Sequence, residues 1–337
     1  MKEYLQLFTR KEYPYFIDRY LETKTLTRLK NITQFCGCDY TNLYNPLFLY
    51  TRYDHSIVVA LMTWHFTHDK KETIIALLHD VGTPCFAHCI DYVLGDYLNQ
   101  ESSEKEIIDI IKNDNKLVAL LEEDNIMLED FNDFTSYHIL ENKTPRLCTD
   151  RLDGVLHTCY IWLHTNSLDE IKEVYDNLTI LKNEDGYMEI GFNNLDVALK
   201  FVKMVYRYAM ELQGNRDKYV MKYISEIVKL SVERKLISLE DLYIKKESEI
   251  CSIFANNFSS WEEFNKANYL TNTNDIPKDN FYISFDTKKR NVIPLVRVNN
   301  TTKRIVEISN EAKDIYESLS NYQDYKYAYI ATINNLN

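Results

Sequence analysis

The stretch LLHDVGTPCFAHCID, residues 77–91, organises the interpretation of this chain. It ends an apolar helical run, and His79 and Asp80 stand side by side at its head. An imidazole and a carboxylate on one rigid element can both reach one divalent cation. A third ligand is available upstream in RYDHS, as His55, and a fourth downstream in TDRLDG, as Asp150. We therefore predict that the fold holds these four side chains around a metal ion.

Length and composition describe a globular protein that is rich in helix. The chain has 337 residues, of which 45% are hydrophobic and 27% charged, with only 7 glycines and 6 prolines. This length suffices for one large domain or two smaller ones, and the scarcity of glycine and proline indicates few tight turns. No apolar run approaches the ~20 residues that span a bilayer, so we expect no membrane association.

The charge and the cysteines restrict the partners and the compartment. A formal net charge of −12 argues against a long nucleic acid as partner, because phosphate backbones attract clustered Lys and Arg. An anionic small molecule stays compatible with this charge, since local cations and a metal override the global sign. The seven cysteines form no paired framework and the N-terminus does not resemble a signal peptide, so we expect reduced thiols in a cytoplasmic protein.

Hydrophobic spacing predicts a mainly α fold. A buried core helix is expected through HSIVVALMTWHF, and another through KETIIALLHDVG, which Gly82 would close as a C-cap. Further helices are expected over residues 101–125, 127–141, 147–164 and 195–235, the last with a break at Gln213-Gly214. A short strand is expected within residues 186–192.

The C-terminal part changes character. FYISF, VIPLVRV and RIVEIS are expected as strands separated by polar turns, followed by a helix over about 309–320. No internal repeat is visible in the sequence. We expect residues 1–255 to form a helical core that carries the metal site, and residues 256–337 to form a small α+β region packed on it.

Four motifs occur in the order found in the HD-domain phosphohydrolase superfamily. They are ETKTLTRLKNITQF, TRYDHSIVVA, LLHDVGTPCFAH and TDRLDG, and residues 203–228 resemble a later helix pair of the family more weakly. The chain resembles most the deoxynucleoside triphosphate (dNTP) triphosphohydrolases, which include bacterial dGTPases and the vertebrate SAM-and-HD-domain dNTPase. The resemblance implies an HD-domain helical bundle, a metal-dependent reaction on a nucleotide, and assembly as a homo-oligomer.

The resemblance also implies the ligands of the metal. His55, His79, Asp80 and Asp150 fall on the family's metal-ligand positions. A mixed set of imidazole nitrogens and carboxylate oxygens suits several divalent ions, so Mn, Fe, Mg, Zn, Co and Ni all remain candidates for the cofactor.

Four further positions correspond to substrate-binding residues of the family. Arg52, one helical turn before His55, falls where the family places an arginine against substrate phosphate, and its planar fork of donors suits phosphate oxygens. Gln34 falls on a position that contacts the sugar. Arg151 falls on a basic position that contacts phosphate, and Tyr206 on a substrate-facing tyrosine.

The catalytic candidates follow the HD dipeptide. His88 and Asp91 match the family's His-x-x-Asp, and in a helix this spacing puts both on one face, where the carboxylate orients the imidazole. Such a pair would protonate the leaving oxygen or supply charge to the α-phosphate, and a purely structural hydrogen bond is the alternative. The family's next catalytic pair, His-Glu, appears as Gln100-Glu101, so the carboxylate of Glu101 remains as a candidate.

Several positions depart from the family and leave the substrate open. Thr83 stands in place of the second histidine of the HD motif, Gly154 in place of a tyrosine, and Tyr208 in place of the VYxH histidine. The leading hypothesis is a dNTP triphosphohydrolase that releases deoxynucleoside and triphosphate. One alternative is a nucleotidase or phosphodiesterase acting on mono-, cyclic or oligonucleotides. A third is a catalytically degenerate nucleotide-binding sensor.

Overall fold

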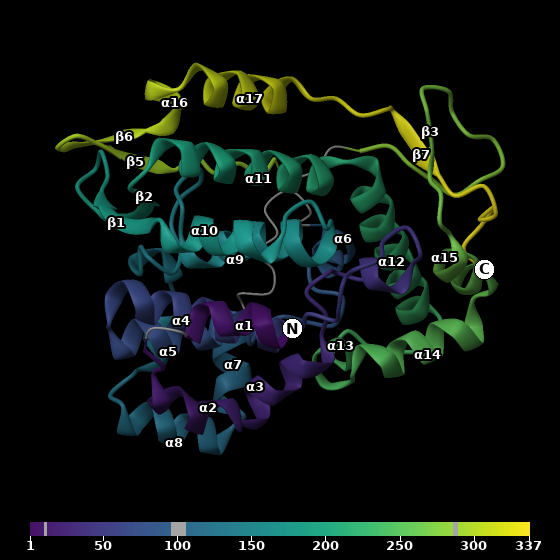
Figure 1. Cartoon of the computed structure of the whole chain (residues 1–337). Coiled ribbons are helices and arrows are strands. Elements are labelled where there is room, and N and C mark those ends of the chain that lie inside the picture. The colour runs from purple at the N-terminus through teal and green to yellow at the C-terminus, as the bar shows by residue number, and fades with distance from the viewer. Residues whose placement is uncertain (10–11, 96–105, 286–288) are drawn as a thin grey trace.

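The computed structural model describes residues 1–9, 12–95, 106–285 and 289–337 (Figure 1). The fold is mainly α, with a small α+β part at the C-terminal end, as the sequence predicted. Within the described residues no helix has the length and the apolar character that crossing a membrane requires.

A helical hairpin in the core positions three of the four predicted metal ligands. It consists of α4 (Arg52–Thr67) and α5 (Lys70–Leu78), which pack closely along each other. A capping box starts α4, because the Thr51 side chain accepts the Asp54 amide hydrogen and the Asp54 carboxylate accepts that of Thr51. The predicted core helix over HSIVVALMTWHF is therefore confirmed, and most of its residues are buried.

The second helix is shorter than predicted. It ends at Leu78, so Gly82 is not its C-cap. The chain turns at once after Leu78, and the Arg28 guanidinium donates to the carbonyls of Val81 at 2.7 Å and Thr83 at 2.8 Å. Buried carbonyls require partners, and Arg28 supplies them. The HD dipeptide consequently sits in a fixed turn after the helix.

Two other helix groups close around this hairpin. The helix α9 (Thr149–His157) lies against α4, where the hydroxyls of Thr63 and Thr149 are 2.9 Å apart. It continues as a π-helical turn through Trp162. The predicted long helix is confirmed as α11 (Leu195–Gln213) and α12 (Asn215–Glu233), with its break at Gly214. The short helix α6 (Cys89–Leu94) packs on α12.

The remaining helices of the core surround these elements. They are α1 (Lys2–Thr9), α2 (Asp18–Leu21), α3 (Lys24–Arg28), α7 (Ile107–Lys112), α8 (Asn115–Glu123), α10 (Leu168–Asp176), α13 (Asp241–Ile244), α14 (Glu247–Asn257) and α15 (Ser259–Lys266). The predicted helix over 127–141 is wrong, because this stretch contains only two 3-10 turns, Leu128–Phe131 and Phe134–Ser136.

A four-stranded sheet joins the C-terminal region to the core. Its strands are β1 (Leu178–Lys182), β2 (Met188–Phe192), β5 (Leu295–Val298) and β6 (Thr301–Arg304), in the order β1-β2-β5-β6. The pair β2–β5 is parallel and the other two pairs are antiparallel. Gly191 pairs with Leu295, and a Cβ added at Gly191 would lie only 2.8 Å from the Leu295 carbonyl oxygen. Glycine therefore permits this close strand contact.

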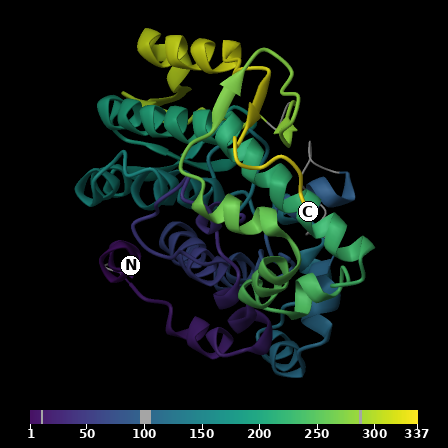
Figure 2. The same ribbon diagram turned by 90° about the vertical axis from the view of Figure 1, so that its right-hand side faces the viewer.

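The rest of the C-terminal region folds back over the helices. A second sheet, in the order β3 (Thr271–Thr273), β7 (Tyr327–Tyr329), β4 (Tyr282–Ile283), packs on α12 through β4 and β7. The stretch RIVEIS is not a strand: α16 (Ile305–Ile308) occupies it, and the predicted helix follows as α17 (Asn310–Asn321). Both views show α17 lying along α11 (Figures 1 and 2). The proposed boundary at residue 255 falls inside α14.

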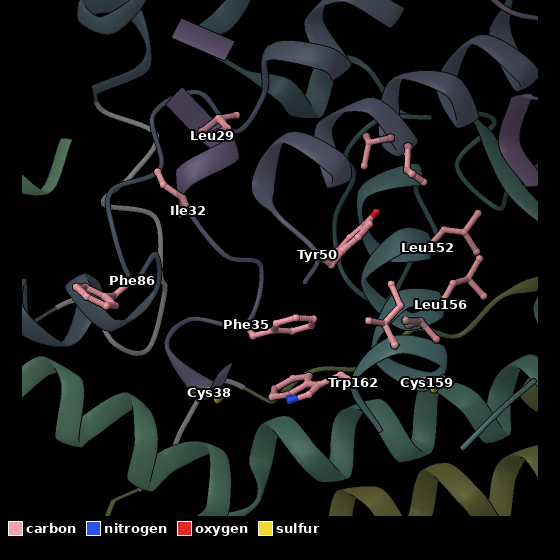
Figure 3. Packing of buried hydrophobic residues seen from close by; sticks show 14 of the residues in the cluster. Leu29, Ile32, Phe35, Cys38, Tyr50, Phe86, Leu152, Leu156, Cys159 and Trp162 are labelled. Atoms are coloured by element: carbon pink, nitrogen blue, oxygen red, sulfur yellow. The ribbon is translucent and has the colours of Figure 1, made fainter. Parts of the chain in front are cut away.

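The hydrophobic core reaches the wall of the predicted site. Figure 3 shows the Phe35 side chain beside Trp162. Phe35 belongs to the segment that also carries Ile32 and Cys38, and this segment faces the helix that carries Leu152. The ring centroids of Phe35 and Trp162 are 5.7 Å apart, and both side chains are buried. This packing anchors the backbone immediately after Gln34.

Candidate metal centre

Three elements bring the four predicted ligands together. His55 lies in the first turns of α4, His79 and Asp80 directly follow α5, and Asp150 lies in the first turn of α9. The hairpin of α4 and α5 sets the first three groups, and the packing of α9 on α4 adds the fourth.

The ligand atoms are spaced as a single cation requires. His55 Nε2 lies 3.1 Å from Asp150 Oδ1 and 3.7 Å from Asp80 Oδ2. His79 Nε2 lies 3.6 Å from Asp150 Oδ1 and 3.9 Å from Asp80 Oδ1. Metal bonds of about 2.0–2.2 Å place neighbouring ligand atoms about 3–3.5 Å apart, so small side-chain adjustments suffice to enclose an ion.

Both histidines present the same ring nitrogen to this space. His79 Nδ1 donates to the Ala76 carbonyl at 2.7 Å, and its buried Nε2 has no hydrogen-bond partner among the described residues. His55 Nδ1 lies 2.6 Å from Asp153 Oδ2, which leaves its Nε2 for the site. Metal-binding histidines typically donate the other ring N–H in this way. An orphaned, buried Nε2 beside two carboxylates fits a divalent ion.

The carboxylates of the site are held in the ionised form. Burial alone would raise the pKa of Asp80, but the Arg52 guanidinium and the two histidines outweigh it and hold that pKa below its usual range. Burial alone would lower the pKa of His55, but its hydrogen bonds to Asp150 and Asp153 raise that pKa to about 10. The space between these groups thus favours a positive charge.

Two neighbours fix Asp80. Arg52 donates to its Oδ2 at 2.8 Å, and the Thr83 hydroxyl donates to its Oδ1 at 3.3 Å. Thr83, which stands where the family has a histidine, thus supports a predicted metal ligand. Arg52 lines the cavity, and its guanidinium binds the predicted metal ligand Asp80.

A second group of metal-binding side chains overlaps the first. His55, Asp153 and His157 also lie within 4.8 Å of one another through possible ligand atoms. All three are buried, and the Asp153 carboxylate already accepts the hydroxyls of Tyr4 and Tyr50 in addition to His55. A carboxylate with three donors is satisfied. Asp153 therefore orients His55, whose other ring nitrogen lies beside the predicted ligand Asp150.

The metal centre opens into a cavity of about 550 Å³, a volume within the range of small-molecule sites. Asp150 leads into it, because 32% of its side chain is exposed, against 2% for His55. The polar residues that line the cavity include the four ligands, Gln34, Arg52, His88, Arg151, His157, Tyr208, Asp217 and Arg290.

His88 and Asp91, predicted as an acid-base pair, are in contact at this cavity. His88 Nδ1 lies 2.9 Å from Asp91 Oδ2, and His88 lines the cavity. Two non-glycine residues with positive φ, Phe86 and Ala87, precede it. Such backbone is costly and persists where the surroundings hold it; here the buried Glu247 accepts the Phe86 amide hydrogen at 2.7 Å. Burial lowers the pKa of His88, so the imidazole is neutral in the ligand-free protein at neutral pH.

The other predicted residues are distributed unevenly. Gln34 and Arg151 line the cavity, and the buried Gln34 Oε1 has no hydrogen-bond partner among the described residues. Tyr206 does not reach the cavity; it lies in a shallow groove between α11 and α17, beside Lys203 and Glu311. Tyr206 thus lies apart from the predicted metal ligands. Glu101 lies outside the described residues.

Sequence reasoning missed three groups that the structure places at the site. Asp153 orients a ligand, and its position one helical turn after Asp150 in an apolar helix was a usable signal. Tyr208 of α11 also lines the cavity. A Cβ added at Gly154 would lie 3.8 Å from its hydroxyl, so this tyrosine lies next to the α9 position at which the family has a tyrosine and this chain has Gly154. Arg290 comes from the C-terminal region and belongs to no recognised motif.

Comparisons with known proteins support the fold. No protein-family model matches the chain. The uncharacterised protein YdhJ of Bacillus subtilis strain 168 is 28% identical over 240 residues, which is 70% of each chain. A hypothetical protein from Aquifex aeolicus has a crystal structure that matches with a TM-score of 0.61 and 16% identity, over 93% of this chain and 91% of that one.

A second solved structure extends this likeness. It is that of a phosphohydrolase from Bacteroides thetaiotaomicron VPI-5482, which matches with a TM-score of 0.62 and 13% identity, over 95% of this chain and 96% of that one. The chain shares the fold of both proteins. At these identities the likeness establishes the architecture only.

Proposed function

We propose that this protein is a metal-dependent phosphohydrolase that acts on nucleotides, with dNTP triphosphohydrolysis as the leading activity. The observation that carries the proposal is the convergence of His55, His79, Asp80 and Asp150 at the floor of a cavity that also holds cationic side chains. Two facts support it: a similar fold occurs in a protein named as a phosphohydrolase, and four motifs resemble the HD superfamily.

The chain supplies the groups that this chemistry needs. When bound, a divalent ion in this site supplies Lewis acidity toward a phosphoryl oxygen and lowers the pKa of water. Arg52 keeps Asp80 ionised and in place. His88, whose Nδ1 is fixed by Asp91, has Nε2 left for a proton transfer to or from the substrate. The Arg151 guanidinium adds positive charge where phosphate oxygens would lie.

The preference for a dNTP rests on the resemblance and on the shape of the site. Gln34, at the family's sugar-contacting position, lines the cavity with a buried amide oxygen that would accept a hydrogen bond from a sugar hydroxyl. Tyr208 provides an aromatic wall next to Gly154. A nucleotidase or phosphodiesterase remains the second candidate, because Thr83 and Gly154 replace family side chains at the site itself.

The test is a screen of nucleotides against several divalent metals, with the products identified by mass spectrometry. Inorganic triphosphate among the products indicates a triphosphohydrolase, whereas phosphate or a nucleoside monophosphate indicates the second candidate. Asp80→Ala should abolish metal content and turnover together, and Asp169→Ala, an exposed aspartate on α10, should change neither. Full turnover by metal-free Asp80→Ala would refute the proposal. Nucleotide binding without turnover over all metals would favour a sensor.

A further inference from the structure

A basic residue from the C-terminal region reaches the cavity. Arg290 lines it together with His55 and Asp80, although about 200 residues of chain separate Arg290 from the HD dipeptide. Its surroundings confirm the placement. The Arg290 guanidinium lowers the pKa of His88 and opposes the burial that raises the pKa of Tyr208, while the Asp150 and Asp217 carboxylates help to raise its own pKa. Arg290 thus lines the same cavity as the predicted metal ligands, His88 and Tyr208.

The backbone next to Arg290 is anchored. The Ile293 amide donates to the Pro145 carbonyl at 2.7 Å, and the Val292 carbonyl accepts the Tyr316 hydroxyl. Val292 is 1% exposed. These contacts tie the segment on one side to the loop before α9 and on the other to α17. An anchored backbone limits the conformational entropy that Arg290 loses on binding a ligand.

The two arginines that the sequence assigned to substrate phosphate are already engaged by the protein. Arg52 binds Asp80. Arg151 donates to the Asn142 side chain at 2.6 Å and to the Arg146 carbonyl at 2.7 Å, and it also pairs with Glu141. Their donors hold a metal ligand and the loop before α9 in place. They supply charge to the cavity, and Arg290, which is itself hydrogen-bonded to the Tyr208 side chain, adds a further guanidinium there.

We propose that Arg290 forms a second anion-binding subsite, which takes the phosphate groups of a nucleotide beyond the group held at the metal centre. The planar guanidinium matches phosphate oxygens in a bidentate fashion, and the neighbouring Tyr208 hydroxyl adds a donor. The subsite rests on the proposed function and specifies its substrate class: nucleoside polyphosphates are favoured over monophosphates. The C-terminal region is then part of the substrate pocket and not a separate appendage.

Binding of two inorganic anions tests the subsite without any turnover. Isothermal titration calorimetry compares inorganic triphosphate with inorganic phosphate, on metal-loaded wild type and on Arg290→Gln. Loss of a charged hydrogen-bonding group should weaken triphosphate binding about tenfold or more. Phosphate binding should change by less than about threefold, because one phosphate is held at the metal. Arg297→Gln, an exposed arginine of the same region on β5, should bind both anions as wild type does.

The outcomes separate this subsite from the enzymatic activity. Equal losses for both anions, or no loss for triphosphate, would overturn the subsite even if the protein hydrolyses nucleotides. A selective loss of triphosphate binding would support it even if the wild type hydrolyses none, in which case the proposed function fails alone. Should Arg290→Gln fold poorly, Arg290→Lys serves instead, since lysine keeps the charge without the fork. The same selective loss is then expected, and unchanged triphosphate affinity would overturn the subsite.

Discussion

Asp153 Oδ2 lies 2.6 Å from His55 Nδ1, and this buried contact fixes which nitrogen of His55 faces the metal centre. Asparagine at this position keeps the volume but presents an amide that can donate, so it permits the wrong imidazole tautomer. Asp153→Asn should therefore weaken metal binding about 10- to 100-fold, as removal of such an orienting partner does. The measurement is metal affinity of the folded variant by calorimetry.

Asp91→Asn is the matched control for Asp153→Asn. Asp91 is also a buried aspartate that orients a histidine, but its partner His88 is not a metal ligand. Metal affinity should therefore stay within about threefold of wild type. Equal metal affinities of the two variants would show that Asp153 does not act through His55.

His88 is expected to serve the reaction and not the metal. His88→Gln should lower kcat about 10²- to 10⁴-fold, because it removes the acid-base group while it leaves the four ligands untouched. Metal content, measured by elemental analysis, should equal that of wild type. His164→Gln, an exposed histidine after the π-helical turn, should retain full activity. Loss of metal in His88→Gln would show that His88 is itself a metal ligand. An unchanged kcat would show that His88 has only a structural role.

The helices were predictable where the hydrophobic period was long and the signal local. The break at Gly214 between α11 and α12 illustrates this, since both helices follow the pattern of the sequence. The helix predicted over 127–141 is wrong because the aspartates in this stretch accept hydrogen bonds from the backbone. Asp130 accepts the Met127 amide hydrogen at 2.8 Å and Asp133 that of Thr135 at 2.9 Å, which favours short turns over a helix.

The strand predicted over RIVEIS is wrong for a related reason. Its β-branched residues are typical of a strand, yet Glu307 accepts the Arg304 amide hydrogen at 3.1 Å and so starts a helical turn. The Arg304 guanidinium is fixed in turn by the buried Glu189 of β2. This contact joins residues that lie 115 positions apart in the sequence, and no local pattern contains it.

The site was predictable only as far as its motifs extended. Tyr206 and Tyr208 differ by two positions on α11, about 200° around the helix, so only one of them can face the cavity. The motif favoured Tyr206, but the packing of α11 turns Tyr208 inward. Arg290 reaches the cavity through the pairing of β2 with β5 and the anchors at Pro145 and Tyr316. Such tertiary placement leaves no mark in spacing or periodicity.

Gly154 and Gly191 should respond in opposite ways to alanine. Gly154 is helical, and a Cβ there would meet only the Tyr208 hydroxyl, at 3.8 Å. Gly154→Ala should therefore raise the free energy of unfolding by about 0.5–1 kcal/mol. A Cβ at Gly191 would lie within 2.9 Å of two atoms of Leu295, so Gly191→Ala should lower that free energy by about 1–3 kcal/mol. Urea denaturation measures both changes. A lower free energy of unfolding for Gly154→Ala would show that there is no room for a methyl group beside Tyr208.

Glu247 makes stability depend on pH. Its buried carboxylate accepts the amide hydrogens of Phe86 at 2.7 Å and Thr33 at 3.1 Å, so it links the two loops that precede His88 and Gln34. Burial, together with the nearby Asp39 carboxylate, raises the pKa of Glu247 from its ordinary value of 4.5 to about 8. Between these two values the folded protein binds the proton more tightly than the unfolded chain does, so this group's contribution to stability falls as pH rises.

Glu247→Gln removes this titration, because glutamine stays neutral. The free energy of unfolding of wild type minus that of Glu247→Gln should therefore decrease from pH 5 to pH 8, by at most about 1.4 kcal/mol per pH unit. Urea denaturation at each pH measures the difference. Glu233→Gln, an exposed glutamate in the last turn of α12, should show a difference from wild type that hardly changes with pH. A constant or growing difference for Glu247→Gln would mean that Glu247 is ionised in the folded protein throughout this range, held by the donors of Thr33, Phe86 and Tyr40.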